Sequence, residues 1–134
     1  MIKYEIRKLE IHSDERGWVA EILRKEHLED KKFGQIYVSV SNPRKVKANH
    51  YHQRKTEWFC VIKGRAKLLL KNLGEERIEE INLTDDNLIT VKIPPRVVHA
   101  IKNIGNDSMY LLAYTTEPYN PKDPDTFSDE SIEI

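Results

Sequence analysis

Apolar and polar side chains alternate along most of this chain with the period of two that is typical of β-strands. The alternating segments are short, and turn-forming residues separate them. Strands are predicted at 4–11, 18–23, 35–41, 58–62, 66–71, 77–83, 89–93, 97–103 and 108–116. The polar stretch 24–33 is the one segment predicted as a short helix. The pattern therefore predicts an all-β protein with little helix.

Turn signals stand at the ends of these segments. Residues 14–17 contain a glycine turn, Gly64 allows a sharp turn between two strands, and Pro94 ends another strand. Roughly eight to ten short strands at this spacing favour a sandwich or a barrel. A double-sheet jelly roll is the natural architecture, because it closes such sheets without exposed edges.

The size and charge of the chain exclude several classes of partner. With 134 residues, the chain fits a single domain over 1–134 with one core. Its 22 Lys and Arg residues balance its 22 Asp and Glu residues. A neutral chain lacks the basic excess that nucleic acids and anionic membranes attract. We therefore expect no nucleic-acid partner and no membrane partner.

Two further features bear on location and on the tail. No apolar run approaches the roughly 18 residues that cross a bilayer, and the N-terminus has no signal-peptide core. Cys60 is the only cysteine, which excludes an internal disulfide and fits a reducing, cytoplasmic location. The tail 119–134 is predicted to begin as a loop, with its end packed on the domain or on a partner subunit.

The candidate chemistry is concentrated in one short segment and one distant strand. His50 and His52 share a face of an extended strand, since one residue separates them. Glu57 follows closely, and His99 comes from a distant strand. An isolated histidine is more often a surface or hydrogen-bonded residue. Three imidazoles with a carboxylate, however, are a ligand set of divalent metals such as Zn, Fe, Mn, Ni or Co, so a metal site is predicted here.

These residues resemble the two-part signature of the cupin family. The residues that fit H-x-H-x4-E-x6-G and P-x4-H-x3-N are His50, His52, Glu57, Gly64, Pro94, His99 and Asn103. The resemblance covers about 14–119 and implies a double-stranded β-helix, the cupin jelly roll. The chain departs from the signature at Leu88 and Arg96, where glycine is usual in cupins. Arg96 places a cation near the expected pocket mouth, which suits a phosphate-bearing ligand.

A narrower resemblance concerns nucleotide-sugar enzymes. Residues 14–18 (DERGW) resemble the D-x-R-G-aromatic opening of dTDP-4-dehydrorhamnose 3,5-epimerases, and 116–121 (TEPYNP) resemble their T-D-x-Y-N-P stretch. The metal-ligand motif and the 120–126 tail are more similar to the C-terminal cupin domain of bifunctional capsule-synthesis enzymes. Those enzymes epimerise and reduce a UDP-linked 4-keto sugar, and their cupin domain binds a metal. Here the module is expected to stand alone, without the reductase domain.

The resemblance implies a nucleotide-sugar epimerase or isomerase acting next to the keto group of a dTDP- or UDP-4-keto-6-deoxy sugar in surface-polysaccharide synthesis. Such a reaction removes an α proton, passes through an enolate and returns the proton to the other face. A divalent metal can polarise the carbonyl. In the metal-free epimerases the histidine that aligns with His50 is the catalytic base, whereas the spacing makes His50 a metal ligand. Both roles stay open.

The same resemblance implies roles for residues outside the cluster. Tyr114 is a candidate catalytic acid, with Tyr110 and Tyr37 as alternatives. Arg16 is expected to bind the substrate diphosphate, because the family's arginine at this place contacts the nucleotide, often across the dimer. Trp58 is a packing residue or an aromatic at the pocket rim that stacks on a base or sugar.

Two other functions stay open. The chain can be a metal-dependent cupin of another class, such as a dioxygenase or a small-molecule isomerase. It can also be a non-catalytic sugar-binding module that works beside a separate reductase. Cupins of this type usually form dimers by exchanging an N-terminal strand, and residues 1–12 have the alternation that such a strand needs. The resemblance therefore implies a homodimer with a nucleotide sugar as its ligand.

Overall fold

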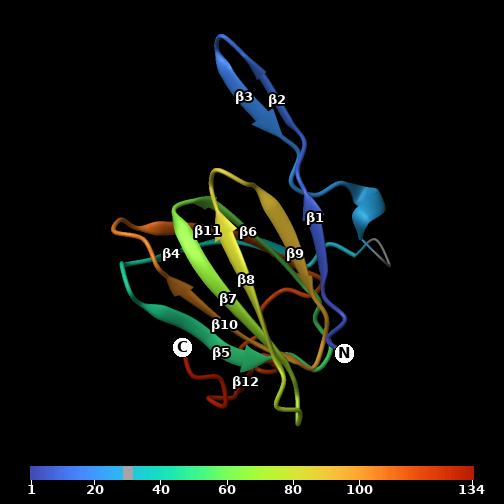
Figure 1. Cartoon of the computed structure of the whole chain (residues 1–134). Coiled ribbons are helices and arrows are strands. Elements are labelled where there is room, and N and C mark those ends of the chain that lie inside the picture. Colours follow the sequence, from blue (N-terminus) through green and yellow to red (C-terminus); the bar gives the residue numbers. More distant parts are fainter. Residues whose placement is uncertain (29–31) are drawn as a thin grey trace.

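The computed structural model describes residues 1–28 and 32–134, and Figure 1 shows the course of the chain. Its strands are β1 (Glu5–Lys8), β2 (Ile11–Asp14), β3 (Gly17–Ala20), β4 (Gln35–Ser41), β5 (Val46–Tyr51), β6 (Glu57–Lys63), β7 (Arg65–Asn72), β8 (Ile78–Thr84), β9 (Ile89–Ile93), β10 (Val97–Asn103), β11 (Met109–Thr115) and β12 (Phe127–Ser128). Within these residues the helical structure is a single 3-10 turn, η1 (Lys25–His27). No helix in the described ranges is long and apolar enough to cross a membrane.

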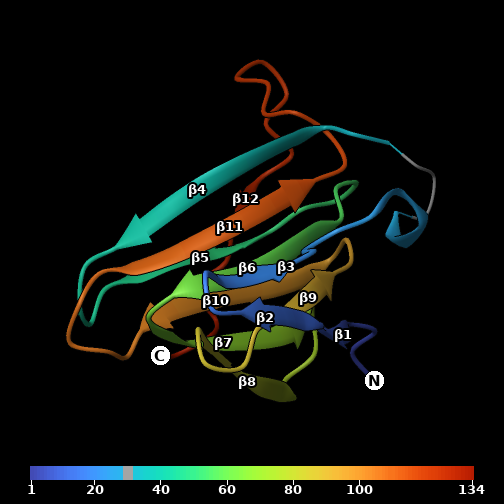
Figure 2. The same cartoon turned by 90° about the horizontal axis from the view of Figure 1, so that it is seen from above.

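Two five-stranded antiparallel sheets form the body of the protein. One has the strand order β1-β9-β6-β11-β4 and the other β12-β5-β10-β7-β8. Figure 2 shows the body from above, with β4 and β11 running side by side. Phe59 and Val91 from one sheet and Leu68, Leu70 and Ile101 from the other belong to the same buried core. The predicted all-β jelly roll is confirmed.

Alternation divides the side chains of each strand between the core and the outer face. In β4, Ile36, Val38 and Val40 share the outer face and are 56%, 55% and 41% exposed. β4 is also an edge strand of its sheet. An apolar outer face on an edge strand is a surface that soluble proteins usually cover.

The hairpin β2–β3 extends away from the two sheets (Figure 1). Asp14 pairs with Gly17 across its turn, so the turn predicted at 14–17 is confirmed. Trp18 and Val19 near the tip are 58% and 64% exposed. The single strand predicted at 4–11 is wrong: Leu9, which is buried, donates its N–H to Leu88 O at 3.0 Å, and the chain then turns into the hairpin.

The remaining predicted strands agree with the structure to within a few residues. The segments 35–41 and 97–103 coincide with β4 and β10. The helix predicted at 24–33 is reduced to η1, in which Leu28 N–H bonds back to Lys25 O. Residues 29–31 of that prediction lie outside the described residues.

Both ends of the chain pack on its own body. Ile2 belongs to the core, and β1 pairs with β9 of the same chain. At the other end, Phe127 pairs with Tyr51 and stacks on it at a ring-centroid distance of 5.4 Å. Ile132 is buried in a second apolar cluster beside Val98. The end of the tail was predicted to pack either on the domain or on a partner subunit. In the described chain it packs on the domain.

Candidate functional site: a cluster of three histidines and one glutamate

β5 and β10 bring two of the predicted ligands together. The strands are antiparallel neighbours, and His99 lies opposite His50. The register shifts next to this pair, because Ala48 and Asn49 adopt left-handed φ angles of 75° and 56° and bulge β5. A bulge redirects the side chains beside it, which here sets the direction of His50.

The other two ligands connect the sheets. Glu57 is the first residue of β6, in the opposite sheet, and is 2% exposed. His52 lies just after β5, in the loop that crosses to β6, and is also buried. The four side chains therefore come from both layers of the jelly roll and meet between them.

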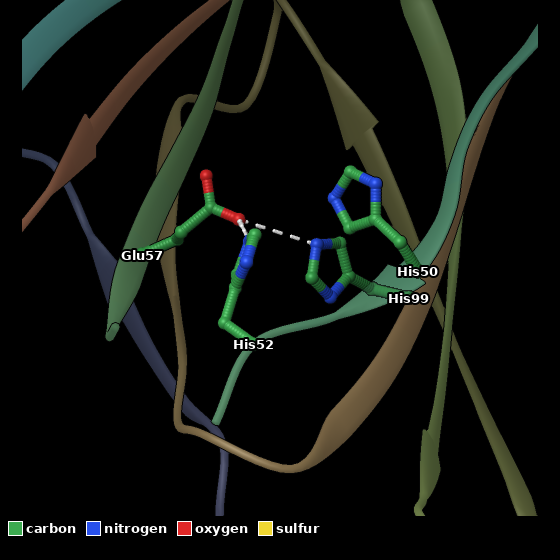
Figure 3. Close-up of side chains that lie close together, drawn as sticks. All are labelled: His50, His52, Glu57 and His99. Carbon is green, nitrogen blue, oxygen red and sulfur yellow. Dashed lines mark hydrogen bonds and ion pairs between the residues drawn. The ribbon is translucent and has the colours of Figure 1, made fainter. Parts of the chain in front are cut away.

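The geometry of the cluster is compact (Figure 3). His52 Nε2 lies 2.6 Å from Glu57 Oε1, and His99 Nε2 lies 3.2 Å from the same oxygen. The His50 ring centroid is 4.7 Å from that of His99 and 5.0 Å from that of His52. One potential ligand atom from each of the four residues lies within 4.8 Å of all the others. The structure thus brings together all four residues that the spacing selected.

Hydrogen bonds fix two of the imidazoles with Nε2 toward the centre. His52 Nδ1 lies 2.6 Å from Asp125 O, and His99 Nδ1 lies 3.0 Å from Val97 O. Because a carbonyl oxygen only accepts, Nδ1 carries the proton in both rings. His99 Nε2 is buried and makes no hydrogen bond within the described chain. A divalent cation binds to an imidazole nitrogen whose lone pair is not used by a hydrogen bond, and His99 Nε2 faces the centre of the cluster in this state. The three imidazoles and the carboxylate therefore fit such an ion.

The electrostatics of the cluster are dominated by burial and by Glu57. Burial first, then the neighbouring His99 and His52, lowers the pKa of His50 to about 3. Burial opposes a charge on His52, but its hydrogen bond to Glu57 outweighs this and raises the pKa of His52. Burial likewise opposes a charge on Glu57, yet its contacts with His52 and His99 lower the pKa of Glu57. The carboxylate is therefore the fixed negative charge of the site.

A cavity of about 210 Å³ opens over the cluster. Tyr37 and Lys55 line it together with His50, His52 and Glu57. Tyr37 donates its O–H to Glu57 Oε2 at 2.9 Å, so the carboxylate is held from both sides. Lys55 Nζ donates to Pro124 O at 3.0 Å. A second cavity of about 170 Å³ shares Tyr37 and extends past His50 toward Lys47.

The structure places two of the other predicted site residues, Trp58 and Tyr114, away from the cluster. Trp58 and Tyr114 are cross-strand partners with ring centroids 5.3 Å apart. They line a separate cavity with Ile36 of the outer face, since Trp58 follows the inward-facing Glu57.

The two predicted arginines are both exposed. Arg16 lies at the hairpin tip, where it pairs with Asp14 at 2.5 Å. Arg96 has a left-handed φ of 64°, as expected where glycine is usual. Its N–H donates to His52 O at 2.7 Å, and its guanidinium donates to Gln53 Oε1 at 3.0 Å. Neither arginine lines the cavity over the cluster within this chain.

Sequence reasoning missed several residues of the site. Lys55 lies between two motif residues, but nothing in its spacing distinguishes it from a surface lysine. Gln35 was also missed, whereas Tyr37, on the same face of β4, was predicted as an alternative acid and does line the cavity. Asp125 belongs to a tail segment whose resemblance was noted, yet its contact with His52 depends on the folded chain.

Comparison with known proteins places this geometry among polysaccharide-synthesis proteins. The family model described as polysaccharide biosynthesis C-terminal domain matches residues 12–127. The spore coat polysaccharide biosynthesis protein SpsL of Bacillus subtilis is 31% identical and covers 96% of this chain and 91% of its own length. A UDP-2-acetamido-2,6-beta-L-arabino-hexul-4-ose reductase of Pseudomonas aeruginosa is 31% identical over 88% of this chain, which spans only 30% of that protein.

A solved structure of a nucleotide-sugar enzyme is also similar to this chain. The dTDP sugar isomerase of Desulfovibrio desulfuricans G20 has a TM-score of 0.84 at 26% identity, covering 95% of this chain and 84% of that one. The resemblance to nucleotide-sugar enzymes that the motifs indicated is confirmed.

Proposed function

Because this chain belongs to the polysaccharide biosynthesis C-terminal domain family, we propose that it is a nucleotide-sugar epimerase or isomerase. Its substrate would be a dTDP- or UDP-4-keto-6-deoxy sugar, and it would act next to the keto group. The observation that carries the proposal is the cavity in which Lys55, Tyr37 and the cluster face one another, in a fold shared with a dTDP sugar isomerase.

Lys55 suits the negative charge that develops on the keto oxygen. Its side chain is buried and lines the cavity, and one of its N–H groups is donated to Pro124 O. A lysine ammonium has three N–H donors, so the described contacts leave two for a ligand. A fixed cation beside a developing oxyanion stabilises the transition state more than the ground state.

His50 is the candidate for moving the α proton. Backbone carbonyls fix the rings of His52 and His99, whereas no hydrogen bond to the His50 ring is found among the described residues. Its lowered pKa keeps its imidazole neutral at pH 7, so one ring nitrogen offers a lone pair. This lone pair can accept a proton, as a catalytic base does, or bind a cation, as a metal ligand does. One nitrogen cannot do both at the same time.

The cluster is also proposed to hold a divalent cation, with His52, Glu57 and His99 as ligands and His50 as the fourth. When bound, the cation would supply a positive charge that polarises the ketone. Tyr37 keeps Glu57 oriented through the hydrogen bond to Oε2, which leaves Oε1 toward the two imidazoles.

Deuterium exchange tests the activity. The purified, metal-replete protein with a dTDP- or UDP-4-keto-6-deoxy sugar in D2O should incorporate deuterium next to the ketone, as read by NMR. Lys55→Met should slow the exchange at least tenfold, while Lys67→Met, which alters a lysine paired with Glu80 on the surface, should leave it unchanged. No incorporation with any such sugar would overturn the proposal.

His50→Asn separates the two roles of His50. If His50 is the base, the variant should keep its metal, measured by elemental analysis, and lose exchange. If it is a ligand, metal content should fall together with activity. A fully active variant with full metal content would exclude both roles.

A second function is favoured by one observation. The chain spans only 30% of the reductase relative, so it can correspond to one module of a larger activity. In that case it would work beside a separate reductase, and deuterium exchange would appear only after the reductase is added.

A homodimer is proposed as the assembly. The outer face of β4 with Val38, and the tip of the β2–β3 hairpin with Trp18, are two exposed apolar patches on one chain. A twofold dimer can bury each patch of one copy against the other copy. Light scattering should give twice the chain mass for the wild type. Val38→Lys should give a monomer, whereas the exposed control Glu76→Lys should remain dimeric.

A further inference from the structure

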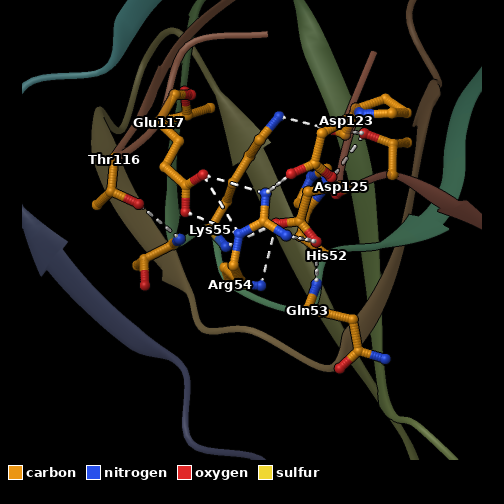
Figure 4. A network of polar contacts seen from close by, with 12 residues as sticks. His52, Gln53, Arg54, Lys55, Thr116, Glu117, Asp123 and Asp125 are labelled. Atoms are coloured by element: carbon orange, nitrogen blue, oxygen red, sulfur yellow. Dashed lines mark hydrogen bonds and ion pairs between the residues drawn. The ribbon is translucent and has the colours of Figure 1, made fainter. Parts of the chain in front are cut away.

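Residues 117–128, which lead into and include the first part of the tail, cross the loop that joins His52 to Glu57 (Figure 4). Asp125 is the centre of this contact. The Asp125 side chain is fully buried. Its Oδ1 accepts the N–H of Gln53 at 2.8 Å. Its Oδ2 accepts the N–H groups of Arg54 and Lys55 at 3.0 and 3.1 Å. One carboxylate thus binds three successive amides of the ligand loop.

The main chain of the same residue contacts the candidate ligand itself. Asp125 O lies 2.6 Å from His52 Nδ1. Thr126 Oγ1 lies 3.4 Å from the same nitrogen and donates to Pro124 O at 3.1 Å. Asp125 has a φ of 47°, in the left-handed region that aspartate tolerates better than most residues. With this backbone, its carboxylate and its carbonyl both face the ligand loop.

Further contacts hold the tail in place. The Arg54 guanidinium donates to Glu117 at 3.2 Å and to Asp123 at 3.1 Å, and Lys55 Nζ donates to Pro124 O. These groups are more than sixty residues apart in the chain, so no local turn produces the arrangement. The tail is therefore bound to the ligand loop at several independent points.

From this arrangement we infer that Asp125 is a positioning residue for His52: it fixes the ligand loop and keeps the His52 proton on Nδ1, with Nε2 toward the cluster. The expected effect of Asp125 on metal affinity rests on the proposed metal site, whereas its effect on the protonation of His52 does not. Outer partners that orient a metal-binding imidazole usually change metal affinity 10- to 100-fold when they are removed.

Asp125→Asn tests the inference, because the amide keeps the shape but presents an NH₂ group to the loop amides. Zinc affinity, measured by competition with a chelator, should fall about 10- to 100-fold. In the metal-free protein, in which His52 Nε2 is hydrogen-bonded to Glu57, long-range ¹H–¹⁵N NMR should show His52 Nδ1 protonated in the wild type and only partly protonated in the variant. Asp107→Asn is the matched control: Asp107 is exposed in the turn between β10 and β11, takes no part in the contacts between the tail and the ligand loop, and should change neither reading.

The outcomes separate the possible explanations. If Asp125→Asn does not fold, Arg54→Gln, which loosens the tail at the surface, should reproduce a smaller loss of affinity and a partial tautomer change. A variant that is only less stable, with wild-type zinc affinity and an unchanged His52 tautomer, would overturn the inference. If the wild type binds no zinc, the metal proposal fails, and the tautomer reading alone still decides the role of Asp125.

Discussion

Replacing Glu57 by Gln removes the negative charge of the cluster and keeps the shape of the side chain. The carboxylate is 2% exposed and lies 2.6 Å from His52 Nε2 and 3.2 Å from His99 Nε2. Tyr37 also donates to it at 2.9 Å, and an amide oxygen can still accept that bond. The variant should therefore fold but offer a cation only neutral ligands.

The expected size of the effect follows from ligand linkage. A ligand at a hundred times its dissociation constant stabilises the folded state by about 2.7 kcal/mol. For a domain of this size, one kcal/mol shifts Tm by roughly 3–5 °C, so zinc should raise the wild-type Tm by roughly 8–14 °C. If losing the anionic ligand weakens zinc about 100-fold, the same zinc concentration stabilises the variant by only about 0.4 kcal/mol. Its Tm should then rise by roughly 1–2 °C.

Scanning calorimetry with zinc and with a chelator measures this difference. Glu80→Gln is the control, since that carboxylate is on the surface and pairs with Lys67 at 3.5 Å. Its zinc-dependent shift should equal that of the wild type. If Glu57→Gln gains as much stability from zinc as the wild type does, Glu57 is not a ligand and the cluster does not bind zinc through its carboxylate.

Three further outcomes are expected. Because Glu57 raises the pKa of His52, zinc has to displace a proton that is bound more firmly than usual. Below that pKa, the zinc affinity measured by titration calorimetry should fall about tenfold per pH unit, and equal affinities at pH 6 and pH 8 would contradict this. Arg96→Gly should stabilise the protein by roughly 0.5–1 kcal/mol in urea unfolding. The left-handed backbone of Arg96 costs roughly 1–2 kcal/mol, whereas glycine loses roughly 0.5–1 kcal/mol through its greater backbone entropy in the unfolded chain. A lower urea midpoint would be the opposite result. Gly34→Ala would place a Cβ 2.3 Å from Glu117 N, so the chain at Glu117 has to shift and the free energy of unfolding should fall by roughly 1–3 kcal/mol. An unchanged urea midpoint would show that this segment can move without cost.

Much of the fold could be read from local pattern. Alternation is a property of neighbouring residues, so 35–41 and 97–103 were predicted with the bounds of β4 and β10. The break before Leu9 has a local sign that the prediction overlooked: Arg7 and Lys8 are adjacent polar residues, and the apolar positions change there from even to odd numbers. There the chain leaves the sheet owing to burial of Leu9 and its bond to Leu88, a residue from another part of the sequence.

The candidate site shows the same division between local and tertiary information. Motif spacing alone selected His50, His52, Glu57 and His99. The sequence left Trp58 either as a packing residue or as an aromatic at the pocket rim, and the structure pairs it with Tyr114 away from the cluster.

The sequence by itself thus determined most of the strands, the jelly roll and the four side chains of the cluster, because these follow from spacing and from a shared motif. Only the tertiary structure decided which groups surround them. Lys55 enters the cavity, and Asp125 reaches across 73 positions to hold His52. The physical reason is that hydrogen bonds between distant residues depend on the folded path of the chain, which no local pattern encodes.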